Sequence, residues 1–446
     1  MPKITFMGAG STVFAKNILG DAMMTDALKD SEIALYDIDG KRLKESALML
    51  NNLNSSVNES RAKITSHLGV RSRKKALKGA DYVINAIQVG GYEPGTVIDF
   101  EIPKKYGLKQ TISDTLGIGG IFRGLRTIPV MLDFAEEMES LCPDALFLNY
   151  TNPMAIVTGA MLRHSNVKTV GLCHSVQACV PRLLQRLEID VNPDETQWRI
   201  GGINHMAWLL EVTHEGRDLY PEIKKRALAM NKAARRKDAE KHGDMVRFEI
   251  MRRFGYYVTE SSEHNAEYMP YWIKAAYPEL VEEFNIPIDE YIRRCINQIA
   301  KWEKQRDEIV NNTKLSHSRT HEYGSYIMEA IETGNPVRIH GNIMNTGLIP
   351  NLPADACVEV PCLVDRNGVQ GTHFGPIPTQ CAALNMTNIN VQLLTIEAAM
   401  TGSRDTVYHA ALLDPHTSAE LSMDDIVKMC DEMIDAHGDY LRLKKK

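Results

Sequence analysis

A short glycine-rich turn near the N-terminus could hold a dinucleotide. Gly8, Gly10 and Ser11 follow the first apolar run and precede a stretch with helical spacing at 13–24. A turn in this context offers backbone N–H groups and the positive end of a helix dipole to a pyrophosphate. Val13 stands where the common fingerprint has its third glycine, so we expect the helix to lie slightly further from the sheet.

An acidic residue at the end of the second predicted strand suits the same ligand. Asp37 lies in the segment ALYDID, within the apolar run at 32–38. A carboxylate there can accept hydrogen bonds from both ribose hydroxyls, and it would repel a 2′-phosphate. The strand, the turn and the carboxylate favour NAD over NADP, whereas in an ordinary strand-turn-helix corner Asp37 would only cap a turn. Asn85, in the run at 81–86, is a further candidate contact to the cofactor.

Cys173 and His205 could together hold a metal ion. They lie in the segments LCHS and GINH, each directly after an apolar run. A cysteine and a histidine brought together across a domain boundary could bind Mn²⁺, Fe²⁺, Co²⁺ or Ni²⁺ and leave positions open for substrate. Distant cysteine and histidine residues are also common packing partners, and a structural zinc site needs four protein ligands. The pair alone leaves both interpretations open.

Two further segments carry polar groups that could contact a ligand. Asn149 and Asn152 lie in NYTNP, just after the buried run at 145–148, where open α/β sheets bind ligands. Asparagine can donate to and accept from sugar hydroxyls, although Asn-Pro can also be a turn that caps the next helix. Asp114 begins DTLGIGG, a glycine-rich segment with no strand before it, which we interpret as a loop on the substrate side.

The elements that must position these groups alternate between strand and helix in the first half of the chain. Apolar runs predict strands at 3–7, 32–38, 63–67, 81–86, 145–148 and 168–173, with helical spacing between them, for instance at 40–57 and 127–141. This alternation predicts an α/β fold with an N-terminal, Rossmann-like, doubly wound parallel sheet.

The pattern changes near Pro193, where we place a domain boundary. Strand patterns at 198–202 and 207–213 flank the INHM turn, a charged and mainly helical region follows at 219–335, and strands return at 336–343 and 356–364. We therefore divide the chain into an NAD-binding domain, residues 1–195, and a mixed α+β domain, residues 196–446. The second domain is expected to contribute a metal ligand, the substrate site and oligomer contacts.

The composition argues against several classes of protein. The 446 residues carry 51 basic and 57 acidic side chains, a formal net charge of -6, without the basic excess that attracts nucleic acid or anionic membranes. No apolar run approaches the roughly 18 to 20 residues of a spanning helix, and the N-terminus has no apolar segment adequate for a secretory signal. Eight cysteines without a CxxC pair indicate reduced thiols. We expect a cytoplasmic protein.

Taken together, the motifs resemble the NAD- and metal-dependent glycoside hydrolases of family four, and most closely the bacterial α-galactosidase branch of that family. The resemblance covers nearly the whole chain and keeps the order of the motifs. The segments that carry it are ITFMGAGSTVFAKNILGD, ALYDID, IQVGGYEPGTVIDF, SDTLGIGGIFRGLRTIP, LNYTNPMA, GLCHSVQ, GINHMAW, VTESSEH, NLP, VEVPCLVD, TNINVQ and DPHT.

The resemblance implies roles for the residues already described. Cys173 and His205 match the pair that binds manganese or another divalent metal, and Asn152, with Asn149 nearby, matches a contact to the sugar hydroxyls. The matching NAD site comprises Gly8, Gly10 and Asp37, to which we add Ser11 and Asn85.

Catalytic roles also follow from the resemblance. His174 stands where other branches carry an aspartate or asparagine associated with protonation of the leaving group. Asp114 matches a carboxylate that raises the basicity of the catalytic base. The base itself is expected within 256–264, where the candidates are Tyr256, Tyr257, Glu260 and His264.

The route that the resemblance implies is oxidation of the sugar at C3 by NAD, loss of the C2 proton, elimination of the aglycone, addition of water and re-reduction at C3. We therefore predict a hydrolase of terminal α-galactosides of the melibiose type, acting as a homodimer or homotetramer. Within the family, an α-glucosidase, an α-galacturonidase or a phospho-sugar enzyme are alternatives. Outside it, the alternatives are an NAD-dependent 2-hydroxy acid dehydrogenase and a catalytically silent NAD-binding protein.

Overall fold

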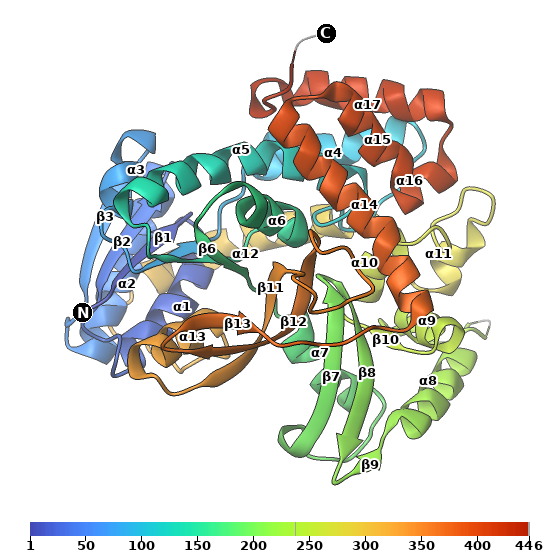
Figure 1. Cartoon of the computed structure of the whole chain (residues 1–446), viewed down its shortest axis with the longest axis horizontal. Helices are drawn as coiled ribbons and strands as arrows, with labels where there is room; N and C mark the ends of the chain where they lie inside the picture. Colours follow the sequence, from blue (N-terminus) through green and yellow to red (C-terminus); the bar gives the residue numbers. More distant parts are fainter. Residues whose placement is uncertain (237, 445–446) are drawn as a thin grey trace.

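One continuous sheet runs through the described residues, 1–236 and 238–444, of the computed structural model (Figure 1). Its strands are β1 (Lys3–Met7), β2 (Glu32–Asp37), β3 (Lys63–Leu68), β4 (Tyr82–Asn85), β5 (Leu146–Asn149), β6 (Lys168–Gly171), β7 (Thr196–Ile203), β8 (Met206–His214), β9 (Arg217–Asp218), β10 (Tyr257–Val258), β11 (Val337–Met344), β12 (Cys357–Asp365) and β13 (Gly368–Gly371). They are ordered β10-β8-β7-β12-β11-β6-β5-β4-β1-β2-β3, with β13 beside β12 and β9 beside β8.

Helices connect and cover these strands. They are α1 (Thr12–Met24), α2 (Gly40–Asn58), α3 (Val70–Leu77), α4 (Val97–Lys105), α5 (Gly117–Leu141), α6 (Met154–His164), α7 (Ser175–Arg186), α8 (Tyr220–Ala234), α9 (Met245–Phe254), α10 (Ser262–Glu267), α11 (Glu279–Glu283), α12 (Glu290–Val310), α13 (Tyr323–Thr333), α14 (Thr379–Thr401), α15 (Arg404–Leu413), α16 (Pro415–Glu420) and α17 (Met423–His437). The last four, orange to red in Figure 1, pack together and against α4 and α5.

The six N-terminal strands are all parallel and lie in the order β3-β2-β1-β4-β5-β6. β4 and β5 are buried along their whole length, and β1 is buried from Ile4 to Met7. Strands that are covered on both faces need apolar side chains throughout, which is why short apolar runs mark them in the sequence. The order is that of a doubly wound, Rossmann-like sheet, so this part of the prediction is confirmed.

The C-terminal strands extend the same sheet in antiparallel orientation. β11 joins β6 where Asn342 lies opposite Gly171, and β12 pairs with β11 along its length. β7 joins β12 where Glu359 lies opposite Gly202, and β7 and β8 form a hairpin. The mixed architecture of the second half is confirmed. The strands before residue 195 and those after it belong to one sheet. The division into two domains at this point therefore stays a prediction.

The glycine-rich segment after Asp114 begins a helix, and the prediction of a loop there is wrong beyond residue 116. α5 starts at Gly117, well before the helical stretch expected at 127–141. A Cβ on Gly119 would lie 2.7 Å from Ser113 O, and one on Gly120 would lie 2.7 Å from the Thr115 carbonyl carbon. These glycines are therefore needed for close packing of the preceding loop on the first turn of α5.

One result bears on membranes. In the part of the chain that the structure describes, no helix combines the length and the apolar character needed to cross a membrane.

Candidate functional site

The glycine turn lies between the end of β1 and the start of α1, as predicted. Gly8 has φ +85°, and a Cβ there would lie 2.7 Å from Ala86 O, so only glycine fits this position. The N–H groups of Gly8 and Ala9 both donate to Tyr36 O at 3.0 Å. Ser11 Oγ is buried and has no hydrogen-bond partner. The turn, an open helix N-terminus and a free hydroxyl are features that fit a dinucleotide pyrophosphate.

Asp37 closes the other side of this turn. Its Oδ2 accepts from Gly10 N at 2.6 Å and its Oδ1 accepts from Asp39 N at 2.9 Å. The carboxylate therefore holds the turn, the role that the sequence left open as the alternative. It also stands at the carboxyl end of β2, where a ribose would lie beside the turn. The two roles are compatible because each carboxylate oxygen can accept more than one hydrogen bond.

Asn85 and Asn149 end neighbouring strands and are both completely buried. Asn85 Nδ2 donates to Asn149 Oδ1 at 2.9 Å, and Asn149 Nδ2 donates to Thr158 Oγ1 at 3.0 Å. The structure thus gives Asn149 a structural role in place of the expected contact to a sugar hydroxyl. The Oδ1 atom of Asn85 is buried without a partner, so the predicted contact of Asn85 to the cofactor stays a prediction.

Cys173 and His205 are brought together, and Glu260 joins them. Cys173 Sγ lies 3.3 Å from His205 Nε2, and Glu260 Oε2 lies 3.6 Å from the same nitrogen. The three ligand atoms all lie within 4.8 Å of one another. Cys173 follows β6, His205 lies in the β7–β8 turn and Glu260 follows β10. A thiolate, an imidazole and a carboxylate form a donor set that suits a divalent transition metal.

The backbone around this cluster is strained. His205 has φ +63° and Glu260 has φ +65°, in the left-handed region that residues with a Cβ seldom adopt. Such conformations persist only where the surrounding structure fixes them, and they are frequent at functional sites. The strain is therefore consistent with turns that are shaped to aim the two side chains at one point.

Thr115 fixes the orientation of the His205 ring. Its hydroxyl donates to Asp114 Oδ1 at 2.7 Å and lies 3.1 Å from His205 Nδ1. The hydroxyl has a single hydrogen and a carboxylate can only accept, so Nδ1 must carry the proton of the neutral ring. Nε2 then presents its lone pair toward Cys173 and Glu260. Metal-binding histidines are commonly held in this way by a partner on the other ring nitrogen.

The cluster attracts positive charge. Although burial opposes protonation, Cys173 and Glu260 raise the pKa of His205 to about 10. A metal ion would replace that proton, because metal binding and proton release are coupled at such sites. The residues present therefore fit a bound divalent metal.

Asp114 and His264 lie beside the cluster. His264 Nε2 is 3.9 Å from Asp114 Oδ1, and its Nδ1 is 2.8 Å from Ser261 Oγ and 3.5 Å from Glu260 Oε1. Burial lowers the pKa of His264. The pKa of Asp114 is lowered despite its burial, because Arg123, His264 and His205 favour the ionised form. Asn152 Nδ2 donates to Asp114 Oδ2 at 3.1 Å, so the residue predicted to contact the sugar lies beside Asp114.

The structure removes two of the four candidates for the base. Tyr257 is fully buried, its hydroxyl donates to Asp244 Oδ1 at 3.3 Å, and Arg247 lies over its ring. Tyr256 packs against Tyr220, with ring centroids 6.1 Å apart. Both rings pack in the apolar cluster between α8, α9 and the sheet, Tyr257 as a buried member and Tyr256 as a partly buried neighbour. The expectation that either tyrosine reaches the site is therefore wrong.

His174 lies at the edge of the site and has a partner that the sequence did not reveal. Its Nε2 lies 2.7 Å from Glu322 Oε2. The hydrogen bond from this carboxylate raises the pKa of His174. Glu322 precedes α13, far along the chain, and no motif marks it. Pairing across 148 residues of sequence could not have been found from local patterns.

Glu267 is a second residue that the sequence did not reveal. Its carboxylate accepts from the backbone N–H groups of Thr111, Ile112 and Ser113 at 2.9, 3.2 and 2.7 Å. These residues directly precede Asp114, so Glu267 holds the loop that carries it. Glu267 lies three residues after His264 on α10, which was the one available signal. One short helix thus carries His264 and supports the residue opposite it.

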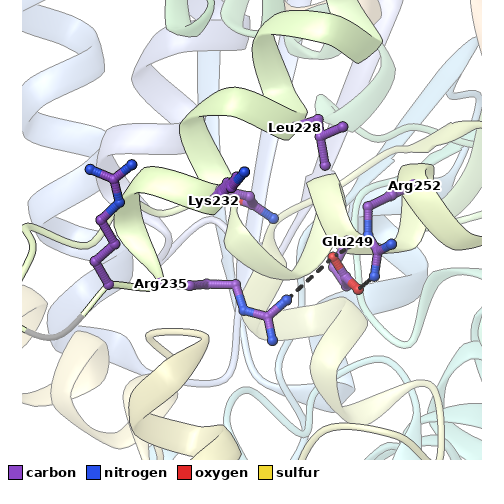
Figure 2. A pocket seen from close by; sticks show the side chains of 7 residues that line it. Leu228, Lys232, Arg235, Glu249 and Arg252 are labelled. Carbon is purple, nitrogen blue, oxygen red and sulfur yellow. Dashed lines mark hydrogen bonds and ion pairs between the residues drawn. The ribbon is translucent and has the colours of Figure 1, made fainter.

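A separate cavity of about 340 Å³ lies between α8 and α9, within the charged region of the chain (Figure 2). It is lined by Leu228, Asn231, Lys232, Arg235, Arg236, Glu249 and Arg252. Figure 2 shows Glu249 between the guanidinium groups of Arg235 and Arg252. This cavity shares no lining residue with the cluster of Cys173, His205 and Glu260.

Two family models match this chain. The family 4 glycosyl hydrolase model matches residues 3–189, and the family 4 glycosyl hydrolase C-terminal domain model matches residues 200–417. The chain belongs to glycosyl hydrolase family 4. The resemblance seen in the motifs is confirmed, and membership of this family decides against the dehydrogenase and the silent NAD-binding protein.

Relatives of this family 4 hydrolase include two α-galactosidases. It is 63% identical to that of Bacillus subtilis (strain 168) over 99% of both chains. It is 34% identical to that of Rhizobium meliloti (strain 1021), over 98% of this chain and 89% of the relative.

Solved structures share its fold. A 6-phospho-α-glucosidase from gut microorganisms, in complex with NAD and Mn²⁺, has a TM-score of 0.81 at 22% identity and covers all of both chains. A 6-phospho-β-glucosidase from Thermotoga maritima, with manganese, NAD⁺ and glucose-6-phosphate, has a TM-score of 0.77 at 18% identity, over 99% and 100% of the chains.

Proposed function

We propose that this family 4 hydrolase cleaves terminal α-galactosides and uses NAD together with a divalent metal such as Mn²⁺. The observation that carries the proposal is 63% identity to the α-galactosidase of Bacillus subtilis over 99% of the chain. The glycine turn and the Cys173, His205 and Glu260 cluster support the two cofactors. When bound, NAD would supply reversible oxidation of the sugar at C3, and the metal would stabilise negative charge on the C3 oxygen.

His264 is assigned as the base that removes the C2 proton. Its buried imidazole has a lowered pKa and so remains able to accept a proton. When Nδ1 donates its hydrogen to Ser261 Oγ, Nε2 carries the lone pair and can accept a proton from the substrate. Asp114 Oδ1 lies 3.9 Å from Nε2, and its negative charge would stabilise the imidazolium as it forms. Glu260 directs one oxygen at His205 and is assigned to the metal.

His174 is assigned as the acid that protonates the leaving oxygen. Its side chain is 55% exposed, whereas its partner Glu322 is only 9% exposed. The carboxylate raises the pKa of His174, so a proton is available at an accessible position on the edge of the site. Asn152, hydrogen-bonded to Asp114, is assigned to a sugar hydroxyl beside the base.

We also propose that the enzyme is a cytoplasmic homo-oligomer, a dimer or a tetramer. In α12, which the structure describes in full, only Val310 is buried, while Ile296 and Ile299 are 50% and 41% exposed. A second copy would cover this apolar surface. The eight cysteines form no disulfide among the described residues, which suits a reducing compartment. Full activity from a species that sediments as a monomer would contradict the oligomer.

The function is tested by hydrolysis of nitrophenyl α-galactoside with NAD, Mn²⁺ and a thiol reductant, beside the α-glucoside and the α-galacturonide with the same leaving group. We expect the galactoside to be cleaved fastest, and its cleavage to need both cofactors. Full activity after exhaustive chelation and removal of nucleotide would contradict the proposed chemistry. A preference for the glucoside or the galacturonide would move the enzyme to another specificity within the family.

A further inference from the structure

Three polar residues are packed together in the sheet behind the metal cluster. Asn204, Asn342 and Glu359 are each completely buried. Both amide atoms of Asn204, Oδ1 of Asn342 and Oε2 of Glu359 are buried without a hydrogen-bond partner. Buried polar groups are nearly always paired, so a group of incompletely paired atoms in one place calls for an explanation.

These residues lie where the two halves of the sheet meet. On one side of β12, Glu359 faces Asn342 of β11, which in turn lies opposite Gly171 of β6. On the other side, Glu359 lies opposite Gly202 of β7. Gly171 is two residues before Cys173, and Gly202 is three residues before His205. Glu359 therefore stands between the two strands that deliver these ligands.

A side chain connects Glu359 to the end of β6, and strand pairing connects it to β7. Asn342 Nδ2 donates to Gly171 O at 3.3 Å and to Glu359 Oε1 at 3.2 Å, which ties the carboxylate to the end of β6. Toward His205, the connection is the backbone of β12, which pairs with β7 where Glu359 lies opposite Gly202. Glu359 belongs to the VEVPCLVD segment, to which the catalytic assignments give no role.

We propose that Glu359 is a positioning residue for the metal site. Through Asn342 it fixes the turn that carries Cys173, and through the pairing of β12 with β7 it fixes the position of the strand that leads to His205. The two ligand atoms are thereby held 3.3 Å apart before the metal arrives. The inference rests on the proposed function, because it takes Cys173 and His205 as ligands. Residues one step beyond the ligands commonly set metal affinity in this way.

The test is Glu359→Gln, which keeps the size of the side chain and an oxygen for Asn342. We expect the dissociation constant for Mn²⁺, measured by calorimetry on the metal-free protein, to rise about 10- to 100-fold. NAD affinity should be unchanged, and excess Mn²⁺ should restore most of kcat. Asn342→Ala removes the connection between Glu359 and Gly171 and should weaken Mn²⁺ binding as well, so the proposal remains testable if one variant does not fold.

The control is Glu137→Gln. Glu137 accepts from Arg73 at 2.7 Å between α3 and α5, so this variant loses a partly buried carboxylate that does not contact the ligand strands. It should lower the unfolding temperature and leave Mn²⁺ affinity unchanged. If Glu359→Gln also lowers only the unfolding temperature, with Mn²⁺ affinity within twofold of the wild type, the inference is overturned.

Failure of the proposed function would look different. If the wild type binds Mn²⁺ no better than Cys173→Ser, the metal chemistry fails and this inference fails with it. If the wild type binds Mn²⁺ but does not hydrolyse α-galactosides, only the substrate assignment fails, and the affinities still decide the role of Glu359.

Discussion

Replacement of Glu267 by glutamine tests how the loop before Asp114 is held. The Glu267 carboxylate is buried and accepts three backbone N–H groups, from Thr111, Ile112 and Ser113. Burial disfavours its ionised form while the N–H groups favour it. Burial prevails and raises the pKa of Glu267 from its ordinary value of 4.5 to about 7.

The size of the effect on stability follows from that shift. A carboxyl with a raised pKa stabilises the fold through its protonated form, so the contribution is complete below about pH 4.5 and is lost as the pH rises to about 7. One pKa unit corresponds to about 1.4 kcal/mol. Between pH 5 and pH 8, the wild type should therefore lose about 2 to 3 kcal/mol of unfolding free energy relative to Glu267→Gln.

The assay is urea unfolding of both proteins at pH 5 and pH 8. Glu249→Gln is the matched control, since the pKa of Glu249 is lowered by Arg252 and Arg253 despite partial burial and lies below this pH range. The wild type should keep a constant stability relative to that control. A stability difference between wild type and Glu267→Gln that does not change with pH, or that grows as the pH rises, would refute the reasoning. The N–H groups would then hold the carboxylate ionised.

Four other variants test the assignments in the site. Glu260→Gln should weaken Mn²⁺ binding in calorimetry, whereas His264→Gln should retain Mn²⁺ and lower kcat at least 100-fold through loss of the base; the reverse pattern would exchange their roles. Gly8→Ala should abolish NAD binding, measured by calorimetry, because the added Cβ would lie 2.7 Å from Ala86 O; wild-type affinity would remove the turn from the cofactor site. Tyr256→Phe should leave kcat within twofold of the wild type, and a large loss would return this tyrosine to the site.

Much of the parallel half of the fold could be predicted from the sequence. Strands buried on both faces are continuous apolar runs, and the helices between them have their own periodicity, so each element carries a local signal. Cys173 and His205 could be identified as candidates from the sequence for a related reason, since polar residues directly after apolar runs mark the ends of strands. The sequence did not show that the two residues lie side by side, because this depends on β11 and β12, which join the two halves of the sheet.

The rest of the site depends on contacts that leave no local pattern. The glycines after Asp114 suggested a loop because glycine is common in loops, whereas here it allows a helix to approach Ser113 and Thr115. Tyr256 was a reasonable candidate for the base by position alone, but its ring packs against an apolar cluster. Glu322 reaches His174 only through the tertiary fold.

The central claim is that the sugar loses its C2 proton during turnover, and this can be measured directly. Nitrophenyl α-galactoside is hydrolysed in heavy water with NAD and Mn²⁺ present, and the galactose released is analysed for deuterium. The account predicts deuterium at C2, since the base exchanges with solvent before that proton is returned. Direct displacement by two carboxylates leaves the C2 hydrogen untouched. Galactose without deuterium at C2, from an assay that consumes substrate, would contradict the account.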